Sequence, residues 1–106
     1  IDDVLDAYDD AVEHIDTAAG HVYNIGGGPQ NTMSIWTEFG PILERLLGRP
    51  VPVAYADWRP GDQPVYVSNI SKARQDLDWS PQVGVTEGIE RLYNWVVENR
   101  HLFKAI

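Results

Sequence analysis

Three short apolar segments are the candidates for β-strands in this chain, and their shortness constrains the fold more than any other feature. They are residues 21–25 (HVYNI), 51–55 (VPVAY) and 64–68 (PVYVS). Pro52 has no backbone N–H to donate, which places the second candidate at the edge of a sheet. A sheet of so few short strands is only marginally stable by itself. The sequence therefore predicts strands that need cover from helices or from another polypeptide.

Helical periodicity dominates much of the remaining chain. Residues 1–15 carry an apolar stripe with aspartates on the opposite face, and a second stripe runs over residues 34–47. Ser34 is a candidate N-cap for the second helix and Gly48 its stop. Pro41 lies inside this pattern and predicts a kink or a late helix start.

Two further helices are predicted toward the C-terminus. Asn69 is a candidate cap for a short helix that carries Ile70, Ala73 and Leu77, and Thr86 for a final helix. The order helix, strand, helix, strand, strand, helix, helix indicates an α/β fold. We expect four to five helices and two to three short strands.

Composition limits the kinds of partner. The chain has 106 residues, which suits one domain with a modest core, and a formal net charge of −8. This acidity argues against nucleic acid, whose phosphates need a positive surface. No apolar run approaches the ~20 residues of a membrane span, and the absence of cysteine excludes disulfides and thiolate metal sites. Because the chain opens at Ile1 inside an amphipathic pattern, we expect it to be part of a longer protein.

A glycine-rich segment, GGGPQN, lies between the first strand candidate and the second helix. Gly26 and Gly28 supply the start of a dinucleotide-binding loop, in which backbone N–H groups cradle a pyrophosphate. Asn31 stands where the third glycine is needed, and no acidic residue ends a second strand about 20 residues later. The spacing favours a structural crossover with positive φ angles over a cofactor loop.

The segment DWRPGDQ combines a rigid turn with opposite charges on its two sides. Pro60 and Gly61 are typical of a type II turn, which holds Arg59 and Asp62 at low entropic cost. Two interpretations are open: a guanidinium that binds a phosphate or carboxylate, or a surface pair with Asp62 that is worth little. The residue types alone favour the surface pair. Trp58, beside the arginine, could stack on a base or a sugar.

The other candidates for chemistry are better explained by solvation or packing. The three histidines show no metal-binding spacing, so the sequence predicts no metal site. The aspartates at the start of the chain lie on an exposed helix face. Trp79 and Trp95 are predicted to pack in the core.

Together these motifs resemble the C-terminal part of extended short-chain dehydrogenases/reductases, the NAD-dependent epimerases and dehydratases of nucleotide sugars. IDDVLDAYDDAVEH is similar to a helix of that family, and HVYNIGGGPQNTMSI to its final core strand and following loop. RPGDQPVYVSNISKARQDLDWSP resembles its closing run of Arg-x-Gly-Asp, Asp-x-x-Lys-Ala and Leu-Gly-Trp-x-Pro. The pair of Asp62 and Gln63 most resembles CDP-paratose and CDP-tyvelose 2-epimerases. Asn69 and Asp78 depart from the family's aspartate and glycine, at positions that look structural.

The resemblance implies binding roles for residues of this chain. Arg59 would contact the substrate diphosphate, and Asp62 the nucleotide ribose or the arginine itself. The other candidates for substrate binding are Gln63, Trp58 and, on a loop near the sugar site, Asn24 and Asn31. The family's catalytic tyrosine has a lysine four residues later, and no tyrosine here has that partner. We therefore expect no catalytic residue in this chain.

The sequence thus predicts that residues 1–106 are the substrate-binding part of a cytoplasmic nucleotide-sugar epimerase or dehydratase. The Rossmann part and its NAD would lie elsewhere in the intact enzyme, and no cofactor is expected on this chain alone. The alternative is a free-standing module that keeps the fold without the chemistry and serves self-association. In either case the first helix and residues 21–25 need a partner, which is the Rossmann part or a second copy.

Overall fold

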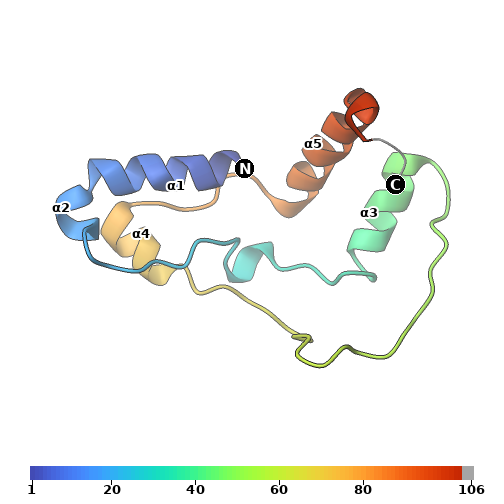
Figure 1. Ribbon diagram of the computed structural model, residues 1–106, viewed down its shortest axis with the longest axis horizontal. Coiled ribbons are helices and arrows are strands. Elements are labelled where there is room, and N and C mark those ends of the chain that lie inside the picture. Colours follow the sequence, from blue (N-terminus) through green and yellow to red (C-terminus); the bar gives the residue numbers. More distant parts are fainter. Residues whose placement is uncertain (104–106) are drawn as a thin grey trace. The chain divides into compact units, whose positions relative to one another are not determined.

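The computed structural model describes residues 1–103. Within them the chain forms two compact units, each built from two separate stretches (Figure 1). Unit 1 comprises Ile1–Thr32 and Arg59–Val83, and unit 2 comprises Met33–Trp58 and the residues from Gly84 onward. None of the described helices is long and apolar enough to cross a membrane.

Helices are the regular structure of both units. Unit 1 holds α1 (Asp2–Glu13), α2 (Ile15–Ala18), the 3-10 turn η1 (Pro29–Asn31) and α4 (Ser71–Leu77); unit 2 holds α3 (Phe39–Leu47), α5 (Val85–Glu98) and the 3-10 turn η2 (Arg100–Leu102). The helical part of the predicted fold is therefore observed.

The predicted strands are not observed. Residues 21–25, 51–55 and 64–68 have no regular secondary structure, and residues 1–103 contain no strand. Residues 52–58 and 63–67 are exposed throughout and run as extended traces (Figure 1). Strand propensity is largely a preference for a pleated, half-buried surface, so segments without a neighbouring strand do not form a ladder. The α/β class is thus observed in its helices only.

The core of unit 1 lies where α1, α2 and α4 meet. Ala7 of α1 and Ala18 of α2 pack with Ala73 and Leu77 of α4, and the group is completed by Ile70 and Trp79. The alanines carry short side chains, which lets the helices approach closely. Leu77 is 2% exposed, so this core is small but dry. The prediction that Trp79 packs in the core is confirmed.

The first helix ends at Glu13, two residues before the end of the predicted stripe. His14 adopts φ −102° and ψ 32°, which breaks the helix between α1 and α2, and its Nδ1 hydrogen-bonds the carbonyl of Asp10 at 2.9 Å. The N-cap of α4 is Ile70 and not the predicted Asn69, although Asn69 Oδ1 accepts a hydrogen bond from the Ser71 N–H at 3.0 Å. Asp78 then ends α4 with φ +53°, a left-handed conformation that favours the glycine of the family pattern.

Unit 2 pairs α3 with α5. Arg45 of α3 and Glu90 of α5 form an ion pair at 2.8 Å between Nη2 and Oε1. The late start predicted from Pro41 is observed, because α3 begins at Phe39 and keeps the proline in its first turn, where no intrahelical N–H is needed. Gly48 ends the helix with φ +69°, as predicted.

Three expectations for the helices of unit 2 are wrong. The N-cap of α3 is Glu38 and not Ser34. The N-cap of α5 is Gly84, and Thr86 lies inside the helix. Trp95 is 49% exposed and contacts Phe103 edge-on, with ring centroids 6.0 Å apart, so it is not a core residue. None of the residues of α5 is buried among the described residues, so the face that carries Trp95 is only partly covered.

Candidate functional site

The turn between the two charged residues has the geometry that its sequence predicts. The Asp62 N–H donates to the Arg59 carbonyl at 3.1 Å, which closes a four-residue turn. Gly61 at the third position has φ +88°. A left-handed residue at that position defines the type II class and favours glycine. The backbone around Arg59 is therefore held by local chemistry rather than by packing.

Within this turn the two charged side chains contact each other. Asp62 Oδ2 accepts from the backbone N–H and the Nε–H of Arg59 at 3.1 and 3.2 Å, and Asp62 Oδ1 lies 3.2 Å from Nη2. The Arg59 side chain is 86% exposed, so this ion pair contributes little to stability. A guanidinium has five N–H donors, and the pair with Asp62 involves those on Nε and Nη2. The N–H groups that do not point at Asp62 remain as donors for a second anion. The structure thus shows the surface pair, which also orients the guanidinium.

The glycine segment is packed tightly against the residues that precede α4. The Gly28 N–H donates to Ser68 Oγ at 2.9 Å, and Gly28 has φ +72°. A Cβ on Gly26 would lie 2.6 Å from Ser68 Oγ, closer than real Cβ contacts. Glycine is therefore needed at Gly26 for close packing and at Gly28 for a left-handed conformation. Both features agree with the interpretation of this segment as a structural crossover.

This packing does not suit a dinucleotide. The Gly28 N–H, which a pyrophosphate would need, is already bonded to Ser68. The segment leads into the three-residue η1 rather than into a long helix, so it offers no helix dipole to a phosphate. The residues of this loop therefore do not fit the phosphates of NAD. Residues 1–103 also contain no group of three metal-ligating side chains.

The structure brings only some of the predicted site residues together. Arg59 and Asp62 contact each other, whereas Asn31 Nδ2 donates to the Gly27 carbonyl at 2.9 Å. Among residues 1–103 no hydrogen bond or ion pair joins these two groups, and the side chain of Asn24 makes neither. Gln63 and Trp58 are exposed, and Trp58 belongs to unit 2.

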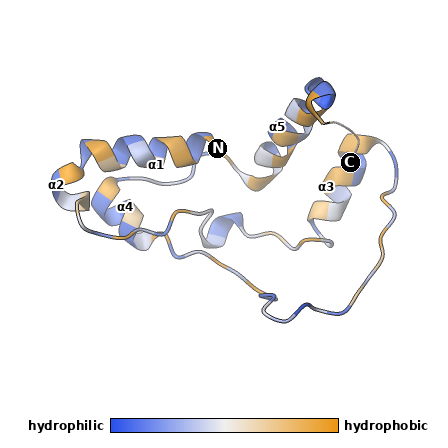
Figure 2. Ribbon diagram, viewed as in Figure 1, coloured by the Kyte–Doolittle hydropathy of each residue, from blue (hydrophilic) through white to orange (hydrophobic). Residues whose placement is uncertain are grey.

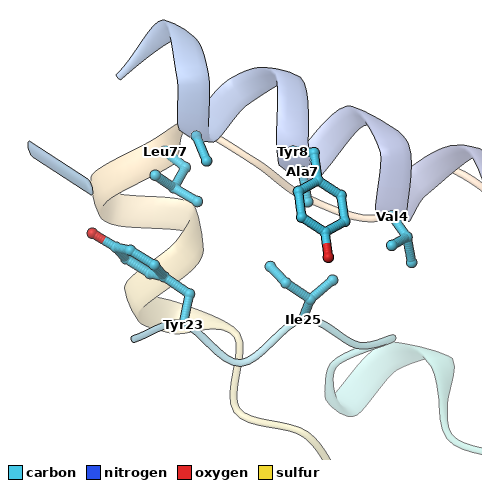
Figure 3. Close-up of a pocket in the computed structure, with 7 residues that line it drawn as sticks. Val4, Ala7, Tyr8, Tyr23, Ile25 and Leu77 are labelled. Atoms are coloured by element: carbon cyan, nitrogen blue, oxygen red, sulfur yellow. The ribbon is translucent and has the colours of Figure 1, made fainter. Parts of the chain in front are cut away.

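An apolar cavity of about 420 Å³ opens on the same face of α1 that carries the apolar stripe (Figure 3). Tyr8 and Val4 of α1 reach toward Ile25 across it (Figure 3). Its lining is completed by Ala7, Ala11, Tyr23 and Leu77. None of the predicted site residues lies there. The stripe of α1 and the apolar residues of HVYNI were the sequence signal for this cavity, which was interpreted only as a surface in need of cover.

Tyr23 joins this cavity to α4. Its hydroxyl donates to Asp76 Oδ2 at 2.9 Å, and the ammonium of Lys72 lies 4.8 Å from its ring centroid. Desolvation of the phenol and then the hydrogen bond to the Asp76 carboxylate raise the pKa of Tyr23 above its ordinary value of 10.0. Lys72 Nζ also donates to the Val22 carbonyl at 3.1 Å. The extended segment is thus fastened to α4 by side chains instead of a β-ladder.

Sequence comparison defines the class of protein. The chain is 39% identical over 85 residues to the UDP-glucuronate 4-epimerase of Thermodesulfobacterium geofontis, a match that covers 80% of this chain and 26% of that enzyme. It is 30% identical over 94 residues to the CDP-paratose 2-epimerase of Salmonella typhi, with 89% of this chain and 28% of the enzyme covered. A UDP-glucose 4-epimerase of Rhizobium leguminosarum bv. trifolii is 34% identical over 104 residues. No family model matches the chain.

These relatives confirm the resemblance drawn from the motifs. The chain corresponds in sequence to part of a nucleotide-sugar epimerase of the extended short-chain dehydrogenase/reductase superfamily. It spans roughly a quarter to a third of the length of these relatives.

Proposed function

We propose that this chain is the substrate-binding part of a nucleotide-sugar epimerase or dehydratase, and that it holds the nucleotide diphosphate. The observation that carries this proposal is the type II turn with Arg59 oriented by Asp62. The names of the relatives supply the ligand class, because they act on UDP- and CDP-linked sugars.

Arg59 is suited to a diphosphate by its preorganisation. The Gly61 conformation and the contacts with Asp62 limit the conformations open to the guanidinium, so less entropy is lost when it binds. A guanidinium and a phosphate ~4 Å apart attract by up to ~4 kcal/mol near a protein surface, before desolvation. The net charge of −8 opposes an anion, but salt screens charges beyond ~8 Å. The charge that opposes a phosphate most directly is the Asp62 carboxylate, 3.2 Å from Arg59 Nη2, and the proposal requires the remaining N–H donors of Arg59 to outweigh it.

The remaining candidates have complementary roles in this proposal. Asn24 and Asn31 carry amides that both donate and accept, which suits sugar hydroxyl groups. Gln63 adjoins the diphosphate side of the site, and Trp58 offers an exposed indole to a base or sugar. NAD and the acid and base groups are assigned to the rest of the intact enzyme, since the glycine loop here does not fit the cofactor. We place that enzyme in the cytoplasm, as the family resemblance implies.

The apolar face of α1 has a place in the same proposal. Tyr8 and Val12 are 70% and 71% exposed, and hydrophobic residues recur along α1 (Figure 2). The cavity in unit 1 is lined by Tyr8 of this face and by Tyr23 and Ile25 of the extended segment. Since the relatives are three to four times longer than the matched segment, we assign this surface to contact with the rest of the enzyme.

A chimera tests the proposed function. This chain replaces the matching segment of the Thermodesulfobacterium geofontis enzyme, and 4-epimerisation of UDP-glucuronate is measured. Arg59→Ala should raise KM about 10- to 100-fold, because charge-assisted hydrogen bonds contribute about 1.5–3 kcal/mol. Arg74→Ala, which changes an exposed arginine of α4, is the matched control and should leave KM unchanged. An Arg59→Ala chimera with the KM of its parent would overturn the assignment.

The second candidate is a free-standing module that associates with itself. The same exposed α1 face and the extended residues 21–25 favour it, because an uncovered apolar face and an unpaired edge promote association. Light scattering separates the two: a defined dimer at low micromolar concentration, with no binding of nucleotide sugars, would favour the module.

A further inference from the structure

Ser68 is a polar residue at an unusual place. It is 7% exposed, and its Oγ accepts the hydrogen bond from the Gly28 N–H across 40 positions of sequence. Among residues 1–103 it is the one buried residue with a polar side chain. Its hydroxyl lies buried between the glycine loop and the segment that leads into α4.

The glycine loop packs closely around this hydroxyl. A Cβ on Gly26 would meet Ser68 at 2.6 Å, and a Cβ on Gly28 would meet Ile70 Cδ1 at 3.0 Å. Ile70 is itself 2% exposed and belongs to the core. The side chains of Ser68 and Ile70 therefore lie against the backbone of the glycine loop, and the Gly28 N–H donates to the Ser68 hydroxyl.

Asn31 depends on this junction. Its side-chain Nδ2 donates to the Gly27 carbonyl at 2.9 Å, and its backbone N–H donates to the Gly28 carbonyl at 3.3 Å. The two acceptors belong to Gly27 and Gly28, and the N–H of Gly28 is the group that donates to Ser68. A displacement of Gly28 that follows a substitution of Ser68 would therefore also displace Asn31, which is bonded to Gly27 and Gly28.

We propose that Ser68 is a positioning residue for the sugar side of the ligand site: it fixes Gly28, and through it the amide of Asn31, without touching the ligand. This inference rests on the proposed function, in which Asn31 faces the sugar and Arg59 the diphosphate. It predicts that Ser68 affects recognition of the sugar and leaves recognition of the nucleotide unchanged.

The experiment compares UDP with UDP-glucose as ligands of the ¹⁵N-labelled 106-residue chain, titrated by NMR. Ser68→Ala should bind UDP as the unchanged chain does, and UDP-glucose about 3- to 10-fold more weakly, the effect of one lost hydrogen bond. Ser71→Ala, which alters an exposed serine at the start of α4, is the matched control and should bind both ligands normally. Arg59→Ala should weaken both ligands.

A second readout keeps the two proposals apart. In the ligand-free chain, hydrogen exchange of the Gly28 amide should accelerate in Ser68→Ala and stay unchanged in Ser71→Ala. Equal losses for UDP and UDP-glucose, no loss for either, or unchanged exchange at Gly28 would each overturn the role of Ser68. Failure of the unchanged chain to bind either ligand would instead contradict the proposed function, and the exchange measurement would still decide whether Ser68 fixes the loop.

Discussion

The carboxylate of Asp3 accepts a hydrogen bond from the backbone N–H of Gln82 at 2.8 Å, and so ties the first turn of α1 to the segment after α4. The other carboxylate oxygen of Asp3 accepts from the Val83 N–H at 3.1 Å. The backbone carbonyl of Asp3 accepts from Trp79 Nε1 at 2.8 Å. This aspartate therefore joins two ends of unit 1 that are far apart in sequence.

Asp3→Ala should lower the free energy of unfolding of unit 1 by about 2 kcal/mol, since two hydrogen bonds to a charged acceptor are lost. Chemical denaturation measures the change, followed by fluorescence in a background in which the other three tryptophans are replaced by phenylalanine, so that Trp79 alone reports. Asp6→Ala removes an exposed aspartate from the same helix and should change stability by less than about 0.5 kcal/mol. Equal effects of the two substitutions would contradict the role of Asp3.

Leu77→Ala should destabilise unit 1 by about 2–5 kcal/mol, because the side chain is 2% exposed and its removal leaves a cavity in a small core. Leu92→Ala is the control, since Leu92 on α5 is 63% exposed. Thermal unfolding by circular dichroism should show a lower midpoint for Leu77→Ala alone. A similar midpoint for both variants would show that the core of α1, α2 and α4 is not the stabilising element.

Local chemistry explains which parts of the fold could be predicted. The stop at Gly48 and the late start at Pro41 depend on residues within one or two turns and are observed, and the two stripes form helices that are shorter than the stripes themselves. Strands depend on a neighbouring strand, which the sequence of residues 21–25 does not specify, and the described part of the chain contains none. Trp95 was misplaced for a related reason: helical periodicity identifies a face but not whether another element covers it.

The same distinction applies to the candidate site. The turn around Gly61 follows from its own residues, and its geometry was predicted. The contacts of Ser68 with Gly28 and of Tyr23 with Asp76 join residues that are 40 and 53 positions apart in sequence. No local sequence pattern predicts such pairs. Asp3 was interpreted as a solvated helix residue because its partners lie 79 and 80 positions away.

Alkaline pH should weaken unit 1 through Tyr23. Its pKa is raised in the folded chain, so the contact with Asp76 stabilises fully below pH 10, and this contribution is lost as pH rises through the folded pKa. The free energy of unfolding should therefore fall above pH 10. Tyr23→Phe should reduce that slope, whereas Tyr55→Phe, an exposed control in unit 2, should not. A slope that is unchanged in Tyr23→Phe would contradict the assignment.

The isolated chain should associate through the apolar face of α1 at high micromolar concentration. Replacing Tyr8 and Val12 by serine removes two exposed side chains from that face and should lower the apparent mass measured by light scattering. Ile35→Ser changes an equally exposed residue outside α1 and should leave the mass unchanged. A compact monomer of the unchanged chain at these concentrations would contradict the prediction.

The most direct test of the central claim is an NMR titration of the 106-residue chain with UDP. The account predicts that the largest amide shifts occur at Arg59, Asp62 and Gln63, that Arg59→Ala weakens binding about 10-fold or more, and that added salt weakens it further. Arg74→Ala should bind as the unchanged chain does. Shifts that gather elsewhere, or equal affinity in Arg59→Ala, would show that the turn does not hold the diphosphate.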